Sequence, residues 1–162
     1  MKETVFRFLK SLSARLLLLT FLWVSFISVL VGYTMLLNWQ LEASSAATKT
    51  IYNMRYHTFR VATFTNPMYT VETFDNEVRR LNELYERLRT GDPWQPLMLP
   101  PGEKIQSEFE AISIAWYDKL LPMLRTQREA RMMVPLETLD PYVNKLSAFS
   151  VMIEKNRDYY IW

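Results

Sequence analysis

Residues 16–37 read LLLLTFLWVSFISVLVGYTMLL and contain no charged side chain. As an α-helix they extend about 33 Å at about 1.5 Å per residue, which is enough to cross the hydrocarbon core of a bilayer. The apolar region of a cleaved signal peptide is shorter, roughly 7–15 residues. The stretch therefore predicts a retained transmembrane helix, and a signal peptide cleaved near Ala43-Ser44-Ser45 is the alternative.

The charges on either side of this stretch predict its orientation. Basic residues stand at positions 2, 7, 10 and 15, and the first charge after the stretch is Glu42. Because positively charged flanks stay in the cytoplasm, we expect residues 1–15 inside and residues 38–162 outside. In a bacterium the predicted location is the inner membrane, with the larger part of the chain in the periplasm.

The remaining sequence predicts helices, because no stretch alternates apolar and polar residues for long enough to form a sheet. The first helix is expected to continue to about residue 65, where Asn66-Pro67 ends it. Short loops favour antiparallel neighbours. The predicted fold is thus all-α, with a transmembrane helix that continues into an antiparallel up-down-up-down four-helix bundle. The bundle helices are expected at about 38–65, 71–89, 103–126 and 141–161, with a loop at 91–102.

Apolar residues at spacings of three and four define the face that each helix is expected to bury. Gly91 is the expected stop of the second helix, and Pro122 is expected to kink the third. Asp140 and Pro141 are expected as N-cap and first residue of the fourth. The predicted buried residues are Phe74, Val78, Leu81, Tyr85 and Leu88; Ile105, Phe109, Ile112, Trp116, Leu120 and Met123; and Leu139, Val143, Leu146, Phe149 or Ser150, Ile153 and Tyr160.

The sequence ends in DYYIW, residues 158–162. Tyrosine and tryptophan concentrate at membrane–water boundaries, and the fourth helix of such a bundle returns toward the end where the first one entered. We therefore expect a second membrane helix to follow in a longer two-pass protein. Aromatic residues placed here by chance are the alternative.

The composition argues against several classes of function. The formal net charge is +2 without a long basic block, so the chain lacks the footprint of a nucleic-acid-binding protein. There is no cysteine, only one histidine, and no phosphate-binding glycine pattern. No acid pair, metal cluster or nucleophile–base pattern shares one face, so we expect neither catalysis nor a cofactor or metal site.

Arg55 is the candidate functional residue, because it shares a helical face with Ile51, Thr58 and Ala62. A planar, permanently charged guanidinium suits a small oxyanion. The alternative is an ion pair between Arg55 and a carboxylate of a neighbouring helix. Arg60 is rotated by about 140° from Arg55 and is expected to be solvated or salt-bridged.

Small residues near Arg55 suggest how a second copy would approach. If the first helices of two copies packed together there, two Arg55 side chains about 7 Å apart would repel by roughly 2.4 kcal/mol at an effective dielectric of about 20. A monoanion between them would remove that repulsion. His57 is expected to be exposed or at an interface. The small residues in question are Ala43, Ala46, Ala47 and Ala62.

The stretch NMRYHTFRV, residues 53–61, resembles the first-helix box of the NarX/NarQ nitrate- and nitrite-sensing histidine kinases, and both arginines match. WYDKLLPMLR, residues 116–125, resembles the third helix of that family, and residues 139–158 resemble the fourth. The four-helix module is shared with type IV pilus chemoreceptor-like sensors. Where the family has a Gly-Ser pair this sequence has Tyr52-Asn53, and Lys49 lies beside the position of a basic family residue.

The resemblance implies a periplasmic four-helix bundle that forms a homodimer and binds nitrate between the first helices. The gripping arginine corresponds to Arg55, and Tyr52, Asn53 and Lys49 are the expected neighbours of the anion. The expected function is ligand sensing for a two-component histidine kinase whose catalytic domains are absent from this chain. The alternatives are a ligand-insensitive dimerisation domain and a chemoreceptor-type sensor.

Overall fold

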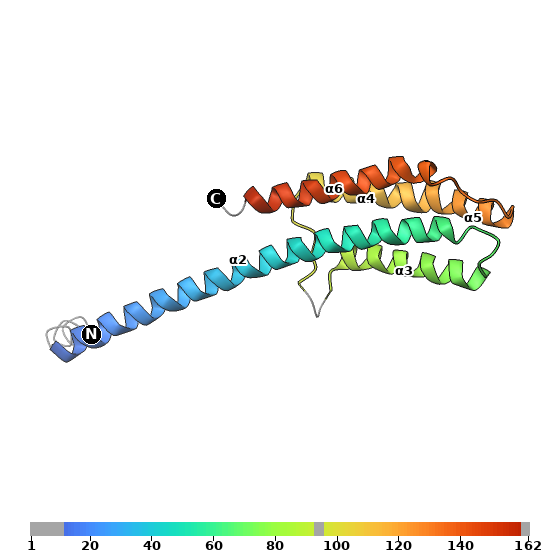
Figure 1. Ribbon diagram of the computed structural model, residues 1–162. Helices are drawn as coiled ribbons and strands as arrows, with labels where there is room; N and C mark the ends of the chain where they lie inside the picture. Colours follow the sequence, from blue (N-terminus) through green and yellow to red (C-terminus); the bar gives the residue numbers. More distant parts are fainter. Residues whose placement is uncertain (1–11, 93–95, 160–162) are drawn as a thin grey trace. The chain divides into compact units, whose positions relative to one another are not determined.

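The computed structural model describes residues 12–92 and 96–159, and this part of the chain contains helices but no strand (Figure 1). The chain divides into two compact units, residues 1–39 and 40–162. Helix α2, Leu12–Thr63, begins in the first unit and ends in the second. The all-α prediction is confirmed.

The second unit is an antiparallel bundle in which successive helices reverse direction (Figure 1). Its first helix is the C-terminal part of α2, and its third helix is built from three consecutive segments. After α2, the elements are α3, Val71–Thr90; α4, Glu103–Ile114; the π-helix η1, Ala115–Leu120; α5, Leu121–Glu129; the 3-10 turn η2, Leu136–Leu139; and α6, Asp140–Tyr159.

The ends of α2 and α3 follow local sequence signals. Helix α2 ends three residues before Asn66, whose Oδ1 accepts a hydrogen bond from the Met68 backbone N–H at 2.9 Å. Thr70 caps the start of α3 by accepting a hydrogen bond from the Thr73 N–H. Gly91 ends α3 with a φ of 78°, a backbone conformation that favours glycine, as the sequence predicted.

The third helix is irregular around Pro122, where a kink is predicted because proline removes one helical hydrogen bond. The chain forms the π-helix η1 just before Pro122, and the Leu121 N–H donates to the Trp116 carbonyl five residues earlier. This extra residue rotates the following segment, so that Leu124 is fully buried while Met123 is only partly so.

The start of the fourth helix also differs. Asp140 has helical dihedral angles, φ −52° and ψ −45°, and continues directly from η2. The predicted N-cap is therefore wrong, because a capping residue has an extended backbone. The predicted flank up to residue 11 and the aromatic residues Tyr160 and Trp162 lie outside the described residues.

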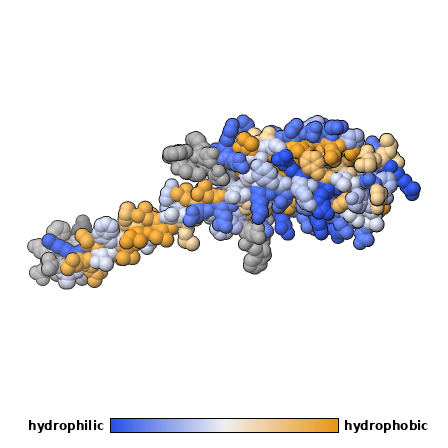
Figure 2. Space-filling view, in the orientation of Figure 1, coloured by the Kyte–Doolittle hydropathy of each residue, from blue (hydrophilic) through white to orange (hydrophobic). Residues whose placement is uncertain are grey.

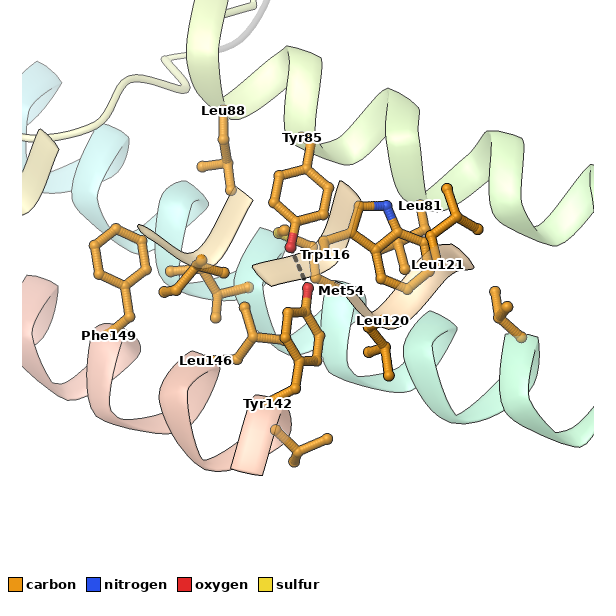
Figure 3. Packing of buried hydrophobic residues seen from close by; sticks show 14 of the residues in the cluster. Met54, Leu81, Tyr85, Leu88, Trp116, Leu120, Leu121, Tyr142, Leu146 and Phe149 are labelled. Atoms are coloured by element: carbon orange, nitrogen blue, oxygen red, sulfur yellow. Dashed lines mark hydrogen bonds between the residues drawn. The ribbon is translucent and has the colours of Figure 1, made fainter. Parts of the chain in front are cut away.

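The bundle core contains the predicted stripes, apart from Tyr160 and the shift at Met123, and it also contains residues that were not predicted, among them Leu97, Leu99, Leu121, Leu124, Val134 and Tyr142. Tyr85 of α3 and Tyr142 of α6 meet at its centre, where their hydroxyls are hydrogen-bonded to each other (Figure 3). The indole N–H of Trp116 donates to Asn82 Oδ1 at 2.9 Å. Both interactions supply partners for polar atoms that the aromatic side chains carry into an apolar interior, where an unpaired polar group is costly.

The N-terminal part of α2 is the one helix among the described residues that is long and apolar enough to cross a membrane. Its large apolar side chains between Leu16 and Leu36 are exposed in the single chain. Figure 2 shows this stretch as a largely orange, apolar surface.

The tyrosine pair gives a test of the core. Tyr142→Phe leaves the buried Tyr85 hydroxyl without this partner, so we expect the free energy of unfolding to fall by about 1–3 kcal/mol. The double variant Tyr85→Phe/Tyr142→Phe is expected to lose less than the sum of the two single losses. Urea denaturation at pH 7 measures all three; strict additivity would contradict the coupling.

The same pair predicts a dependence on alkaline pH. Burial raises the pKa of Tyr85 and Tyr142 above the usual value near 10. Above about pH 10 the unfolded chain releases protons that the folded chain keeps, so the free energy of unfolding falls as the pH rises. The double phenylalanine variant should show a smaller fall than the parent chain. Tyr117, whose pKa burial also raises, is present in both proteins, so part of the fall should remain in the variant.

Candidate anion site on helix α2

The bundle part of α2 has a buried face, an exposed stripe, and Arg55 between them. The side chains of Ile51, Thr58 and Ala62, which share the face of Arg55, are at most 2% exposed. Arg55 itself is partly exposed. The exposed stripe, at spacings of four, three and four, consists of Ser45, Lys49, Tyr52 and Tyr56.

Arg55 has no carboxylate partner within the described part of the chain. Its guanidinium carbon lies 5.9 Å from the centre of the Tyr52 ring, within range of a cation–π contact. Its Nε is shielded from solvent and forms no hydrogen bond there. Among the described residues, Arg55 therefore does not form the ion pair with a neighbouring helix that was the alternative.

The other predicted site residues differ in their relation to Arg55. Tyr52 is 49% exposed and lies against the guanidinium. Asn53 and Lys49 are exposed, and no hydrogen bond among the described residues joins either of them to Arg55. The structure thus brings Tyr52 and Arg55 together within one chain, and leaves Asn53 and Lys49 on the solvent side of α2.

Arg60 has an acidic partner and further contacts on the side of α2 that faces α3. Its Nε lies 3.1 Å from Glu77 Oε1, and its guanidinium contacts the Tyr56 and Phe64 rings. Its Nη1 also donates to the Tyr56 hydroxyl, which is the main reason that the pKa of Arg60 is raised. The prediction of a salt-bridged Arg60 is confirmed.

The centre of this cluster is Glu77, a residue that sequence reasoning missed. Its side chain is 3% exposed, and it lies 2.5 Å from His57 Nδ1 and 3.7 Å from Arg80 Nη1 in addition to Arg60. A carboxylate this deeply buried requires such partners. The available signal was its position three residues after Phe74, on the edge of the apolar stripe of α3.

Two further expectations need correction. His57 is partly buried and paired with Glu77, because it faces α3 rather than solvent. The small residues near Arg55 are not a free surface for a second copy, because they pack inside the bundle of their own chain. The fully or partly buried ones are Ala43, Ala46, Ala47 and Ala62.

Neither the site nor the comparisons identify a cofactor. Within residues 12–92 and 96–159, no group of three or more His, Cys, Asp or Glu side chains is placed to hold a metal ion. Comparison of the chain with protein-family models, with curated proteins and with solved structures found no match.

The Glu77 cluster can be tested by removing its negative charge. Glu77→Gln leaves His57 and Arg60 without their anion, so we expect the free energy of unfolding to fall by roughly 1–3 kcal/mol. The matched control is Glu83→Gln on the exposed face of the same helix, for which a change within about 0.5 kcal/mol is expected. Urea denaturation measures the free energy of unfolding of both variants. If Glu77→Gln lost no more than Glu83→Gln, the cluster would add nothing to stability.

Proposed function

We propose that this chain is the anion-sensing input module of a membrane receptor of the NarX/NarQ type, with Arg55 as the residue that binds the anion. The bundle would lie outside the cytoplasm, and nitrate or nitrite would bind between the first helices of a homodimer. The observation that carries the proposal is the contrast between Arg60, which forms an ion pair with Glu77, and Arg55, which has no anionic partner among the described residues.

An anion would supply what Arg55 lacks. A guanidinium donates in a planar fork that matches two oxygens of nitrate or nitrite. The buried Nε of Arg55 is a donor without an acceptor among the described residues, and such groups are rare in folded proteins. The Tyr52 ring covers part of the guanidinium, which leaves a small planar anion better suited to this position than a bulky one.

The dimer contact proposed here uses the exposed stripe of α2 instead of the alanines. Tyr52 and Tyr56 are 49% and 56% exposed, and tyrosine is enriched in protein interfaces. Arg55 borders this stripe, so two copies packed along it would bring two guanidiniums toward one axis. An anion between the two guanidiniums offsets their repulsion. The paired state would therefore be more stable with ligand bound than without it, so ligand would favour pairing.

The same helix would carry the response. Helix α2 is continuous from Leu12 to Thr63, and it contains both Arg55 and the apolar stretch. It contains no proline, and its one glycine is Gly32. A shift of the helix backbone at Arg55 would therefore be passed along hydrogen-bonded turns and not absorbed at a break.

One observation favours a second candidate, a dimerisation domain that binds no small ligand. The Tyr52 ring already provides a favourable contact for the Arg55 cation, and the family that the sequence resembles has glycine at this position. In that case the exposed stripe would pair two copies regardless of anions.

The experiment compares unfolding of the full chain in lipid nanodiscs, in sodium nitrate, sodium nitrite and sodium chloride of equal ionic strength. A ligand at 100 times its dissociation constant stabilises by about 2.7 kcal/mol. Arg55→Ala should abolish the gain. Arg60→Lys, which keeps a cation near Glu77, is the control and should retain it.

A disulfide reports the pairing independently. The chain has no cysteine, so Ser45→Cys introduces one exposed thiol on the stripe. Crosslinking that rises with nitrate supports the sensor. Crosslinking that is equal in nitrate and chloride, without stabilisation by either anion, supports the second candidate. Equal losses from Arg55→Ala and Arg60→Lys would refute the site.

A further inference from the structure

A cavity of about 880 Å³ opens at the end of the bundle that carries the α2–α3 turn. Its walls come from residues 67–70 of that turn, from the first turns of α3, and from the C-terminal part of α5 with Arg131. In Figure 2 apolar and hydrophilic surfaces adjoin at this end of the bundle. No sequence motif marks this site, because it combines segments that are about 60 residues apart in the chain.

Arg128 fastens the cavity to the end of α2. Its Nη1 donates to the Phe64 carbonyl at 2.7 Å and to the Asn66 carbonyl at 2.9 Å, and its Nη2 donates to the Tyr69 carbonyl at 2.5 Å. These carbonyls belong to the turn after α2, where no helical or sheet ladder supplies them with donors. Arg128 therefore has a structural role, and both of its terminal nitrogens already donate.

Arg125 and Arg131 are the free cations of the cavity. Both are exposed, and within the described part of the chain neither forms an ion pair. Asp75 and Glu129 also line the cavity, and among the described residues neither forms an ion pair. The lining thus contains three arginines and two carboxylates, which leaves a surplus of one positive charge. The surplus fits a guest that carries one negative charge.

Arg131 occupies a position where glycine is preferred. Its φ is 55°, in the left-handed region, and it lies two residues after Glu129, the last residue of α5. The Arg131 N–H bonds the Arg128 carbonyl at 3.0 Å and the Met132 N–H bonds the Gln127 carbonyl at 2.9 Å, which is the Schellman pattern. A non-glycine residue at this position is strained, so the arginine there has a cost in stability.

The rest of the lining is apolar. Phe74 is buried, whereas Tyr69, Met68 and Val71 are 40%, 88% and 64% exposed. Exposed methionine adapts to the shape of a partner, and clusters of exposed apolar side chains mark binding surfaces. A purely inorganic anion would leave this part of the cavity unused.

We propose that the cavity binds a small organic monocarboxylate with an apolar body, whose carboxylate is held by Arg125 and Arg131 and whose body lies against Met68 and Val71. The guanidinium fork matches a carboxylate with two parallel hydrogen bonds. The site is separate from the anion site proposed at Arg55, and its occupant would contact the turn that Arg128 holds against α5.

Phenylacetate is the probe, and uncharged phenylacetamide is its matched control. The full chain in nanodiscs, labelled with ¹³C at the methionine methyls, is titrated with each up to about 10 mM, which covers dissociation constants in the millimolar range. The NMR signal of the Met68 methyl is assigned from its loss in Met68→Leu. Phenylacetate should shift this signal, and phenylacetamide should not. Inorganic phosphate should not displace phenylacetate.

Two variants test the arginines. Arg125→Gln should raise the dissociation constant about tenfold, as expected for the loss of one charge-assisted hydrogen bond. Arg131→Gly should weaken binding similarly while raising the melting temperature, because glycine relieves the left-handed strain; this separates lost binding from lost folding. Arg87→Gln, an exposed arginine of α3 outside the cavity, should change neither.

The proposal is overturned if Met68 does not respond to phenylacetate, if phenylacetamide or phosphate binds as well, or if Arg125→Gln and Arg131→Gly bind with unchanged affinity. Arg55→Ala separates the two proposed sites. It should abolish stabilisation by nitrate and leave phenylacetate binding intact, so either site can fail without the other.

Discussion

The buried carboxylate of Glu77 constrains both the packing and the chemistry of the first helix. It faces three cationic or ionisable side chains, and it is the carboxylate that pairs with Arg60 and His57 of α2. Because a buried carboxylate without such partners is costly, α2 must present this side to α3. That rotation in turn places Arg55 at the border between the bundle interior and the exposed stripe.

Arg55 and Arg60 of α2 therefore have different surroundings although they are five residues apart. Arg60 is fixed by an acid, a hydroxyl and two rings, which is the environment of a structural residue. Arg55 has a ring on one side and an unused donor. Arg128 and Arg131 repeat the contrast at the other site, where one arginine holds backbone carbonyls and the other occupies a strained position beside a cavity.

Much of the fold was predictable because helix periodicity and breakers are local properties. The buried stripe of α3, the stop at Gly91 and the end of α2 before Asn66-Pro67 follow from spacing and backbone preference. The burial of Glu77 was not predictable, because it depends on partners supplied by another helix. The same holds for the alanines of α2, since a small residue suits a contact within the chain as well as between chains. At the candidate site the sequence predicted Arg55 and Tyr52, and the cavity at Arg125 and Arg131 was missed because its parts come together only in the folded chain.

The π-helix also affects how this sequence should be compared with others. One extra residue in a helix turns everything after it by about 100°. In the third helix this rotation about the helix axis orients Leu121 and Leu124 toward the core. It also places Arg128 beside the turn that follows α2. A related chain with a regular α-helix here would be one residue shorter between Trp116 and Leu121. An alignment that allows no gap at that point would match interior positions with surface positions throughout α5.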